Sequence, residues 1–152
     1  MECGTLLKTR RALLLLALLL GVPFGSAATQ SVVLVVRADS PVSDLDSVTV
    51  RKLFLGVPVL VNGSPLRPIR NRSDSQLDLV FLQDIAAMSQ SAYERQILIG
   101  VNRQGWLRPE ELDSNARILQ KLYADPYAVA FMWARDVAHD PKIRIVRVLW
   151  TD

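Results

Sequence analysis

Two arginines stand directly before a segment whose pattern predicts the start of a helix. Arg70 and Arg72 close an extended stretch interrupted by prolines, and apolar residues at helical spacing follow from Leu77. The first amides of a helix lack intrahelical partners and carry partial positive charge, so a helix start beside guanidinium groups can hold an anion. We therefore predict a site for a small oxyanion, formed by these residues and their amides: Arg70, Arg72, Asp74, Ser75 and Gln76.

Two aspartates in the same segment support an alternative. Asp74 and Asp78 have the same sign of charge as an oxyanion, and like charges about 4 Å apart repel by about 4 kcal/mol at an effective dielectric near 20. In the alternative, the arginines form a solvated edge with one structural ion pair, and the aspartates cap the helix or favour its dipole. The sequence leaves both interpretations open.

No other residue pattern predicts chemistry of a specific kind. The sequence has no Ser/His/Asp arrangement, nucleophile elbow, P-loop or metal-ligand spacing. Its single histidine, His139, lies in a polar turn, and its single cysteine, Cys3, lies near the first residue. We therefore expect a binding protein and not an enzyme, with no catalytic residue, no metal site and no cofactor.

The first 28 residues have the pattern of a secretory signal peptide. Lys8, Arg10 and Arg11 precede an apolar run over residues 12–20, and small residues end at Ala28. The apolar run is far shorter than the roughly 20 residues that cross a bilayer. We predict a signal peptide over residues 1–28, a domain over residues 29–152 and a periplasmic location.

Removal of this leader brings the chain close to charge balance. The leader holds three of the 18 basic and one of the 15 acidic residues, so the formal net charge falls from +3 to about +1. Such a chain lacks the basic footprint of a nucleic-acid-binding protein. About 124 residues remain, which suits one domain with its own core. No later segment is long and apolar enough to predict a transmembrane helix.

Strands and helices are predicted to alternate along the domain. The first half is expected to contain a strand buried on both faces (31–37), a short helix capped by Ser43 or Ser47 and ended by Gly56, an extended piece (57–61), a hairpin turn at Asn62-Gly63 and an edge or irregular strand (65–70). The second half is expected to contain helices (74–88, 91–99, 114–124), an irregular loop (100–112) and two buried strands (128–133, 143–150). This alternation predicts a layered α/β domain.

Four motifs in the chain follow a familiar order. They are a helix ending in Leu53-Phe54-Leu55-Gly56, a turn at Asn62-Gly63-Ser64-Pro65, a helix start at Arg72-Ser73-Asp74, and a turn at Asp125-Pro126 before the strand Ala128-Val129-Ala130-Phe131-Met132. From about Val32 to Val148 the chain resembles one lobe of the bacterial periplasmic phosphate-binding proteins of ABC transporters, in the type II solute-binding superfamily. The resemblance implies a three-layer α/β lobe with a mixed central sheet flanked by helices.

The resemblance also implies a ligand and partners. Its ligand would be phosphate or a related oxyanion, and its partner an ABC permease or a periplasmic sensor. The family's helix start usually reads Arg-x-Asp-Gly-Ser-Gly-Thr; here Arg72 and Asp74 match, but the next four residues are Ser75-Gln76-Leu77-Asp78. The glycines that permit close backbone approach are absent, and only one of the family's two lobes is present.

Three hypotheses follow. In the first, the protein binds phosphate or a related oxyanion for uptake or sensing. In the second, it is a half-size, non-transport relative that has lost the ligand and serves as a periplasmic protein-interaction module. In the third, two copies form a homodimer that rebuilds a two-lobed cleft.

Overall fold

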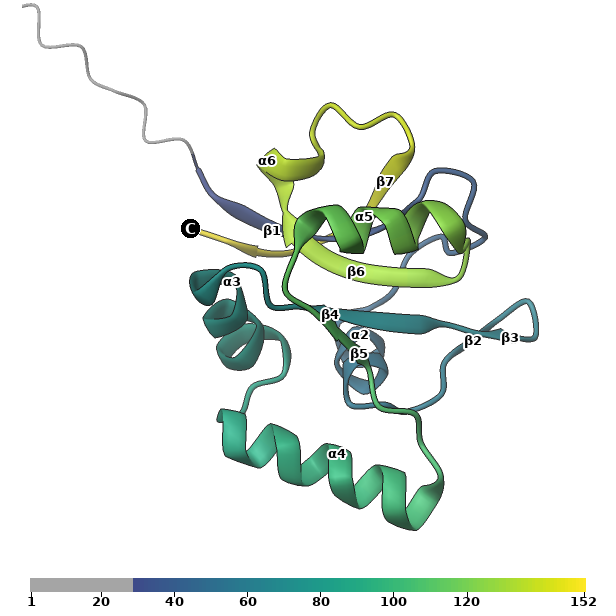
Figure 1. Ribbon diagram of the computed structural model, residues 1–152, viewed down its shortest axis with the longest axis vertical. Helices are drawn as coiled ribbons and strands as arrows, with labels where there is room; N and C mark the ends of the chain where they lie inside the picture. The colour runs from purple at the N-terminus through teal and green to yellow at the C-terminus, as the bar shows by residue number, and fades with distance from the viewer. Residues whose placement is uncertain (1–28) are drawn as a thin grey trace, which may run out of the picture.

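A mixed sheet of five strands forms the centre of the protein, in the order β5-β4-β6-β1-β7 (Figure 1). The computed structural model describes residues 29–152, so the predicted signal peptide lies outside the described residues. The strands are β1 (Ser31–Arg37), β4 (Arg67–Asn71), β5 (Glu110–Leu112), β6 (Ala128–Trp133) and β7 (Ile143–Thr151). Strand β4 is parallel to β5 and β6, whereas β1 is antiparallel to β6 and β7.

Helices cover both faces of the sheet, which gives three layers. One face carries α2 (Ser47–Phe54), α3 (Ser75–Val80), the π-helix η1 (Phe81–Ile85) and α4 (Gln90–Gln104). The other face carries α5 (Asn115–Ala124) and α6 (Ala134–Val137). This arrangement confirms the predicted α/β lobe with a mixed central sheet flanked by helices.

The continuous apolar run of β1 places side chains in the core on both faces of the sheet. Val32, Leu34 and Val36 belong to the core under α2, α3, η1 and α4, and Val33 and Val35 belong to the core under α5. A strand alternates its side chains between faces, so a strand buried on both sides needs an apolar residue at every position. The predicted doubly buried strand is thereby confirmed.

The turn and cap signals identified most of the element boundaries. Asn62 and Gly63, with φ of 51° and 79°, form the turn between β2 (Leu60–Val61) and β3 (Ser64–Pro65), as the hairpin signal predicted. The cap of α2 is different from the prediction: Asp46, and not Ser43 or Ser47, accepts a hydrogen bond from the Thr49 amide at 2.9 Å. Helix α5 begins and ends as predicted.

Strand β4 lies inside the sheet and not at its edge, so that prediction was wrong. The Arg67 amide donates toward the β6 side, to the Tyr127 carbonyl. The ring nitrogen of Pro68, one residue further, therefore points to the other side, where β5 pairs only from Ile69 onward. A proline is tolerated there because no ladder hydrogen bond is missing.

Helix α4 is longer than predicted, and a glycine in its second half permits the Trp106 ring to pack closely on it. It continues through Gly100 to Gln104 and ends at Gly105, whose φ is 66°. A Cβ on Gly100 would lie 2.2 Å from the Trp106 ring, so only glycine lets the indole fold back onto the helix. The predicted irregular loop is correspondingly shorter, and it contains β5.

Strand β7 is an edge strand, so the prediction of a second fully buried strand was wrong. It pairs with β1 alone, with two irregularities of register, and it leaves Ile145 and Val148 exposed. Strand β6, by contrast, is buried at every position, as predicted. Over residues 29–152, no helix has the length and apolar character needed to cross a membrane.

Candidate functional site

Arg70 is a buried arginine on one side of the sheet. Its residue has no exposed surface, and its guanidinium carbon lies 5.0 Å from the Phe81 ring centroid and 4.6 Å from that of Tyr93. Phe81 in turn stacks on Phe131, with centroids 4.7 Å apart. The aromatic core therefore fixes one face of the guanidinium, through contacts that favour a cation.

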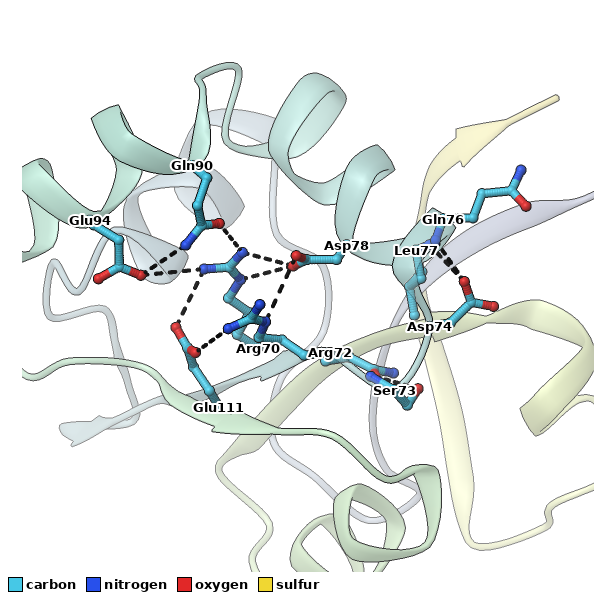
Figure 2. A network of polar contacts seen from close by, with 11 residues as sticks. Arg70, Arg72, Ser73, Asp74, Gln76, Leu77, Asp78, Gln90, Glu94 and Glu111 are labelled. Atoms are coloured by element: carbon cyan, nitrogen blue, oxygen red, sulfur yellow. Dashed lines mark hydrogen bonds and ion pairs between the residues drawn. The ribbon is translucent and has the colours of Figure 1, made fainter.

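Each nitrogen of this guanidinium has an acceptor within the protein (Figure 2). Asp78 Oδ1 accepts from Nε at 3.2 Å and from Nη2 at 2.7 Å. Gln90 Oε1 accepts from Nη2 at 2.8 Å, and Glu111 Oε1 accepts from Nη1 at 3.3 Å. Glu94 lies 3.8 Å from Nη1. A buried charge is stable only with such partners.

Three separate segments supply these partners. The parallel pairing of β4 with β5 places Glu111 opposite Arg70, and the first turns of α3 supply Asp78. Gln90 and Glu94, four residues apart at the start of α4, lie on one side of that helix and are joined at 3.1 Å. The network therefore links α3, α4, β4 and β5.

Two further arginines complete the network. Arg72 Nη1 lies 3.2 Å from Glu111 Oε2, its Nε lies 3.8 Å from Asp78 Oδ2, and Arg108 pairs with Glu94. We call this set the arginine cluster: Arg70, Arg72, Arg108, Asp78, Gln90, Glu94 and Glu111. Three arginines face three carboxylates, so the arginine cluster has no formal net charge with which to attract an anion.

The predicted helix start lies beside this cluster and is capped by its own aspartate. Asp74 Oδ1 accepts from the amides of Gln76 at 2.7 Å and Leu77 at 3.3 Å, and Oδ2 accepts from the Trp133 indole at 3.1 Å. Partial burial acts to raise the pKa of Asp74, but the indole and amide hydrogen bonds outweigh it, so that pKa is lowered. The amides that would face an oxyanion are therefore occupied by a carboxylate.

The structure divides the predicted site residues into two groups. Arg70 and Arg72 converge on Asp78 and Glu111, inside the arginine cluster (Figure 2). Asp74, Ser75 and Gln76 lie together at the start of α3, where Ser75 and Gln76 are exposed. That these residues bind an oxyanion stays a prediction.

Arg72 differs from Arg70 in its access to solvent. Its side chain is 45% exposed, and it lines a surface hollow of about 360 Å³ together with Arg117. Glu111 and Asp113 line the same hollow, and Asp113 lies 3.5 Å from Arg117. Both arginines at this surface thus already have acidic neighbours.

Sequence reasoning missed a second buried polar group below the helix start. Asn71 is fully buried; its amide donates to the Phe131 carbonyl at 3.1 Å, and its Oδ1 accepts from the Ser73 amide at 2.9 Å and hydroxyl at 2.7 Å. Asn115 lies 2.9 Å from the Ser73 hydroxyl and donates to Asp136 at 2.9 Å. An asparagine at the end of a buried strand was the available signal.

Within residues 29–152, no three His, Cys, Asp or Glu side chains are grouped so that they could hold a metal ion. The carboxylates of the arginine cluster are instead bound to guanidinium groups.

Comparison with known proteins places this geometry in a structural class. No protein-family model and no curated protein matches the sequence. Among solved structures, an ABC-type phosphate transport receptor from Vibrio cholerae superposes with a TM-score of 0.50 at 15% identity, over 78% of this chain and 46% of that chain. PstS from Borrelia burgdorferi superposes with a TM-score of 0.52 at 9% identity, over 78% of this chain and 47% of that chain.

These similarities concern the fold, because the sequence identities are low. The chain spans less than half the length of each of these two solved structures. The first of those structures is a phosphate transport receptor. The described chain has the fold of one lobe of the phosphate-binding, type II substrate-binding proteins of ABC transporters.

Proposed function

We propose that this protein is a non-transport relative of the phosphate-binding proteins and serves as a protein-interaction module in the periplasm. In this proposal residues 1–28 are a cleaved signal peptide and residues 29–152 are the exported domain. The observation that carries it is the arginine cluster, in which each nitrogen of Arg70 is already bound by a side chain of the protein.

An entering oxyanion would compete with carboxylates that the lobe cannot readily release. An oxyanion that paired with Arg70 would have to displace Asp78 or Glu111, and the displaced carboxylate would lose its own partner. The anion would also have to displace Asp74 from the amides of Gln76 and Leu77. The contacts therefore favour a lobe that no longer uses this position for a free oxyanion.

Exposed aliphatic side chains support a role in protein contacts. Leu98 on α4 and Leu107 in the following loop are 52% and 76% exposed, and Ile99 and Val101 are also exposed. Single exposed leucines are ordinary, but four exposed aliphatic residues within residues 98–107 make this segment a candidate for contact with another protein. Residues 98–107 are therefore the first segment to test for a partner.

A second candidate is oxyanion binding for uptake or sensing, with an ABC permease or a periplasmic sensor as partner. It is favoured by Arg72, which occupies the motif position of the family's arginine and is partly exposed in a hollow beside Arg117. In this candidate Arg72, Ser75 and the Gln76 amide would form the site, after Asp74 moves away from the helix start.

Calorimetry on residues 29–152 distinguishes the two candidates. Titration with phosphate and sulfate should give no saturable heat under the proposal. Saturable phosphate binding that Arg72→Ala abolishes and Arg103→Ala preserves would instead establish the second candidate. Arg103 is a suitable control because it is exposed at the end of α4.

The partner is sought by site-specific photo-crosslinking in cells. A photoreactive residue at position 98 or 107 should crosslink to one defined envelope protein, whereas the same residue at exposed position 117 should not. Crosslinks absent from both positions would contradict the proposed interaction role. Light scattering on the purified domain tests the homodimer, which requires a mass twice that of the monomer.

A further inference from the structure

A hollow of about 290 Å³ lies away from the arginine cluster, between α2, η1 and β7. We call it the α2–η1 hollow. Part of its lining is apolar, supplied by Val48 and Val50 of α2, Ile85 of η1 and Leu149 of β7. Its volume is close to the lower limit of about 300 Å³ for small-molecule pockets, which favours a compact ligand.

The rest of the lining includes two opposite charges from different elements. Arg51 comes from α2 and Asp84 from η1, and Ser47 also lines the hollow. Over residues 29–152, neither Arg51 nor Asp84 forms an ion pair or a side-chain hydrogen bond. Both side chains are exposed to solvent, so a ligand that carries both charges can reach them from the open side of the hollow.

The backbone beside Asp84 is unusual in two ways. Five residues, Phe81–Ile85, form a π-helix, and such segments occur frequently at functional sites. Ala87, which also lines the hollow, has a φ of 54°, in the left-handed region that a residue with a Cβ rarely adopts. Strained residues of this kind concentrate at ligand-binding positions. The geometry of the segment is therefore consistent with a site and is independent of the charges.

We propose that the α2–η1 hollow binds a small zwitterion with an apolar side chain, of the α-amino acid class. The ligand carboxylate pairs with Arg51 and its ammonium group with Asp84. Its side chain packs on Val50, Ile85 and Leu149. The site is separate from the predicted oxyanion position and does not depend on the proposed interaction role.

The first test asks whether both ligand charges are needed. Residues 29–152 are titrated with L-leucine and L-phenylalanine by calorimetry and by thermal shift. We expect saturable binding of the free amino acids. L-leucine methyl ester, which lacks the carboxylate, and N-acetyl-L-leucine, which lacks the ammonium group, should each bind at least about tenfold more weakly, as loss of one charged hydrogen bond predicts.

The second test assigns each charge to its residue. Arg51→Gln should weaken L-leucine binding about tenfold and remove the preference for L-leucine over its methyl ester. Asp84→Asn should do the same for the N-acetyl analogue. Lys52→Gln is a matched control, because it removes the same charge from the next residue of α2, outside the hollow. Circular dichroism checks that each variant is folded.

Three results would overturn the proposal. The first is no saturable binding of either amino acid at tens of millimolar. The second is an equal loss of affinity in Lys52→Gln and Arg51→Gln. The third is concentration-dependent self-association, seen by light scattering, that Arg51→Gln abolishes, which would make the hollow an interface between copies. Phosphate is titrated in parallel. Phosphate binding tests the proposed function and amino-acid binding tests the α2–η1 hollow, so each proposal can fail without the other.

Discussion

Arg70 on β4 and Glu111 on β5 are register partners, and their side chains meet at 3.3 Å although 41 residues separate them in the sequence. The pairing of two parallel strands thus brings a carboxylate to a fully buried guanidinium. Asp78 and Gln90 complete the contacts from two helices. Arg70 and Arg72, two of the residues of the predicted oxyanion site, thus lie in a cluster that has no formal net charge.

Loss of Asp78 should be strongly destabilising. Asp78→Ala leaves Arg70 buried without its shortest contact, so we expect a loss of about 3–5 kcal/mol in the free energy of unfolding by urea. Combining it with Arg70→Met should restore much of that loss, because the double variant buries no unpaired charge. Asp113→Ala, at a carboxylate 79% exposed, should change stability by less than about 0.5 kcal/mol. Equal effects at the two aspartates would contradict this account.

Asp74 should contribute to stability through its cap, and this contribution should depend on pH. Asp74→Ala removes the acceptor of two amides and of the Trp133 indole, and we expect it to cost about 1–2 kcal/mol at pH 7. The pKa of Asp74 is lowered in the folded state. Its stabilisation is therefore complete above the unfolded value near 3.8 and is lost as pH falls through the lower folded pKa.

Urea unfolding at a series of pH values measures this effect. The stability difference between the wild type and Asp74→Ala should be constant from pH 7 to about pH 5 and should shrink below about pH 4. A difference that does not change with acidification would show that the carboxylate charge is unimportant for the cap.

Tyr93 should remain protonated at alkaline pH. Burial raises the pKa of Tyr93 above its ordinary value of 10.0, and its hydroxyl donates to the Phe54 carbonyl at 2.7 Å. The folded protein retains this proton while the unfolded chain loses it, so stability is full below pH 10 and falls as pH rises toward the folded pKa. Tyr93→Phe should reduce this alkaline loss and should cost about 1 kcal/mol at pH 7.

Absorbance at alkaline pH and urea unfolding together check this prediction. In the wild type, the phenolate signal of Tyr93 should develop only with unfolding. Tyr127→Phe serves as the control for removal of one phenol group from the absorbance signal. Phenolate absorbance that appears before unfolding in the wild type, and that is absent from Tyr93→Phe, would contradict the prediction.

Gly100→Ala should disturb the packing of Trp106. The added Cβ would lie 2.2 Å from the indole, and overpacking of this kind costs about 1–3 kcal/mol, partly offset by the better helix propensity of alanine. Tryptophan fluorescence should change as the ring moves. Gly105→Ala introduces left-handed strain but places nothing within 4 Å of the new Cβ, so it should destabilise without a spectral shift.

The sequence predicted those features that local signals determine. The apolar run of β1, the Asn62-Gly63 turn and the α5 boundaries all depend on residues close together in the chain. Strand β5 was missed because Glu110–Leu112 is too short and polar to show a period of two. It is a strand because it pairs with β4. The interior place of β4 likewise depends on a partner more than 35 residues away.

The candidate site illustrates the same limit. Arg70 and Arg72 were identified by their position before a helix, but their acceptors are scattered over three other elements. No short-range pattern joins Arg70 to Gln90 or Glu111. Burial of Arg70 follows from the aromatic rings around it, and those rings come together only in the folded state. The predicted oxyanion site depends on guanidinium and amide groups that are exposed to solvent. A sequence motif does not specify that exposure.

The edge strand β7 has a consequence for how copies of this domain behave when crowded. Its two irregularities of register against β1 interrupt the regular spacing of its free amides and carbonyls, and a bulged, twisted edge is a poor template for another strand. Although Ile145 and Val148 are exposed there, concentrated samples should resist fibril growth through this side of the sheet.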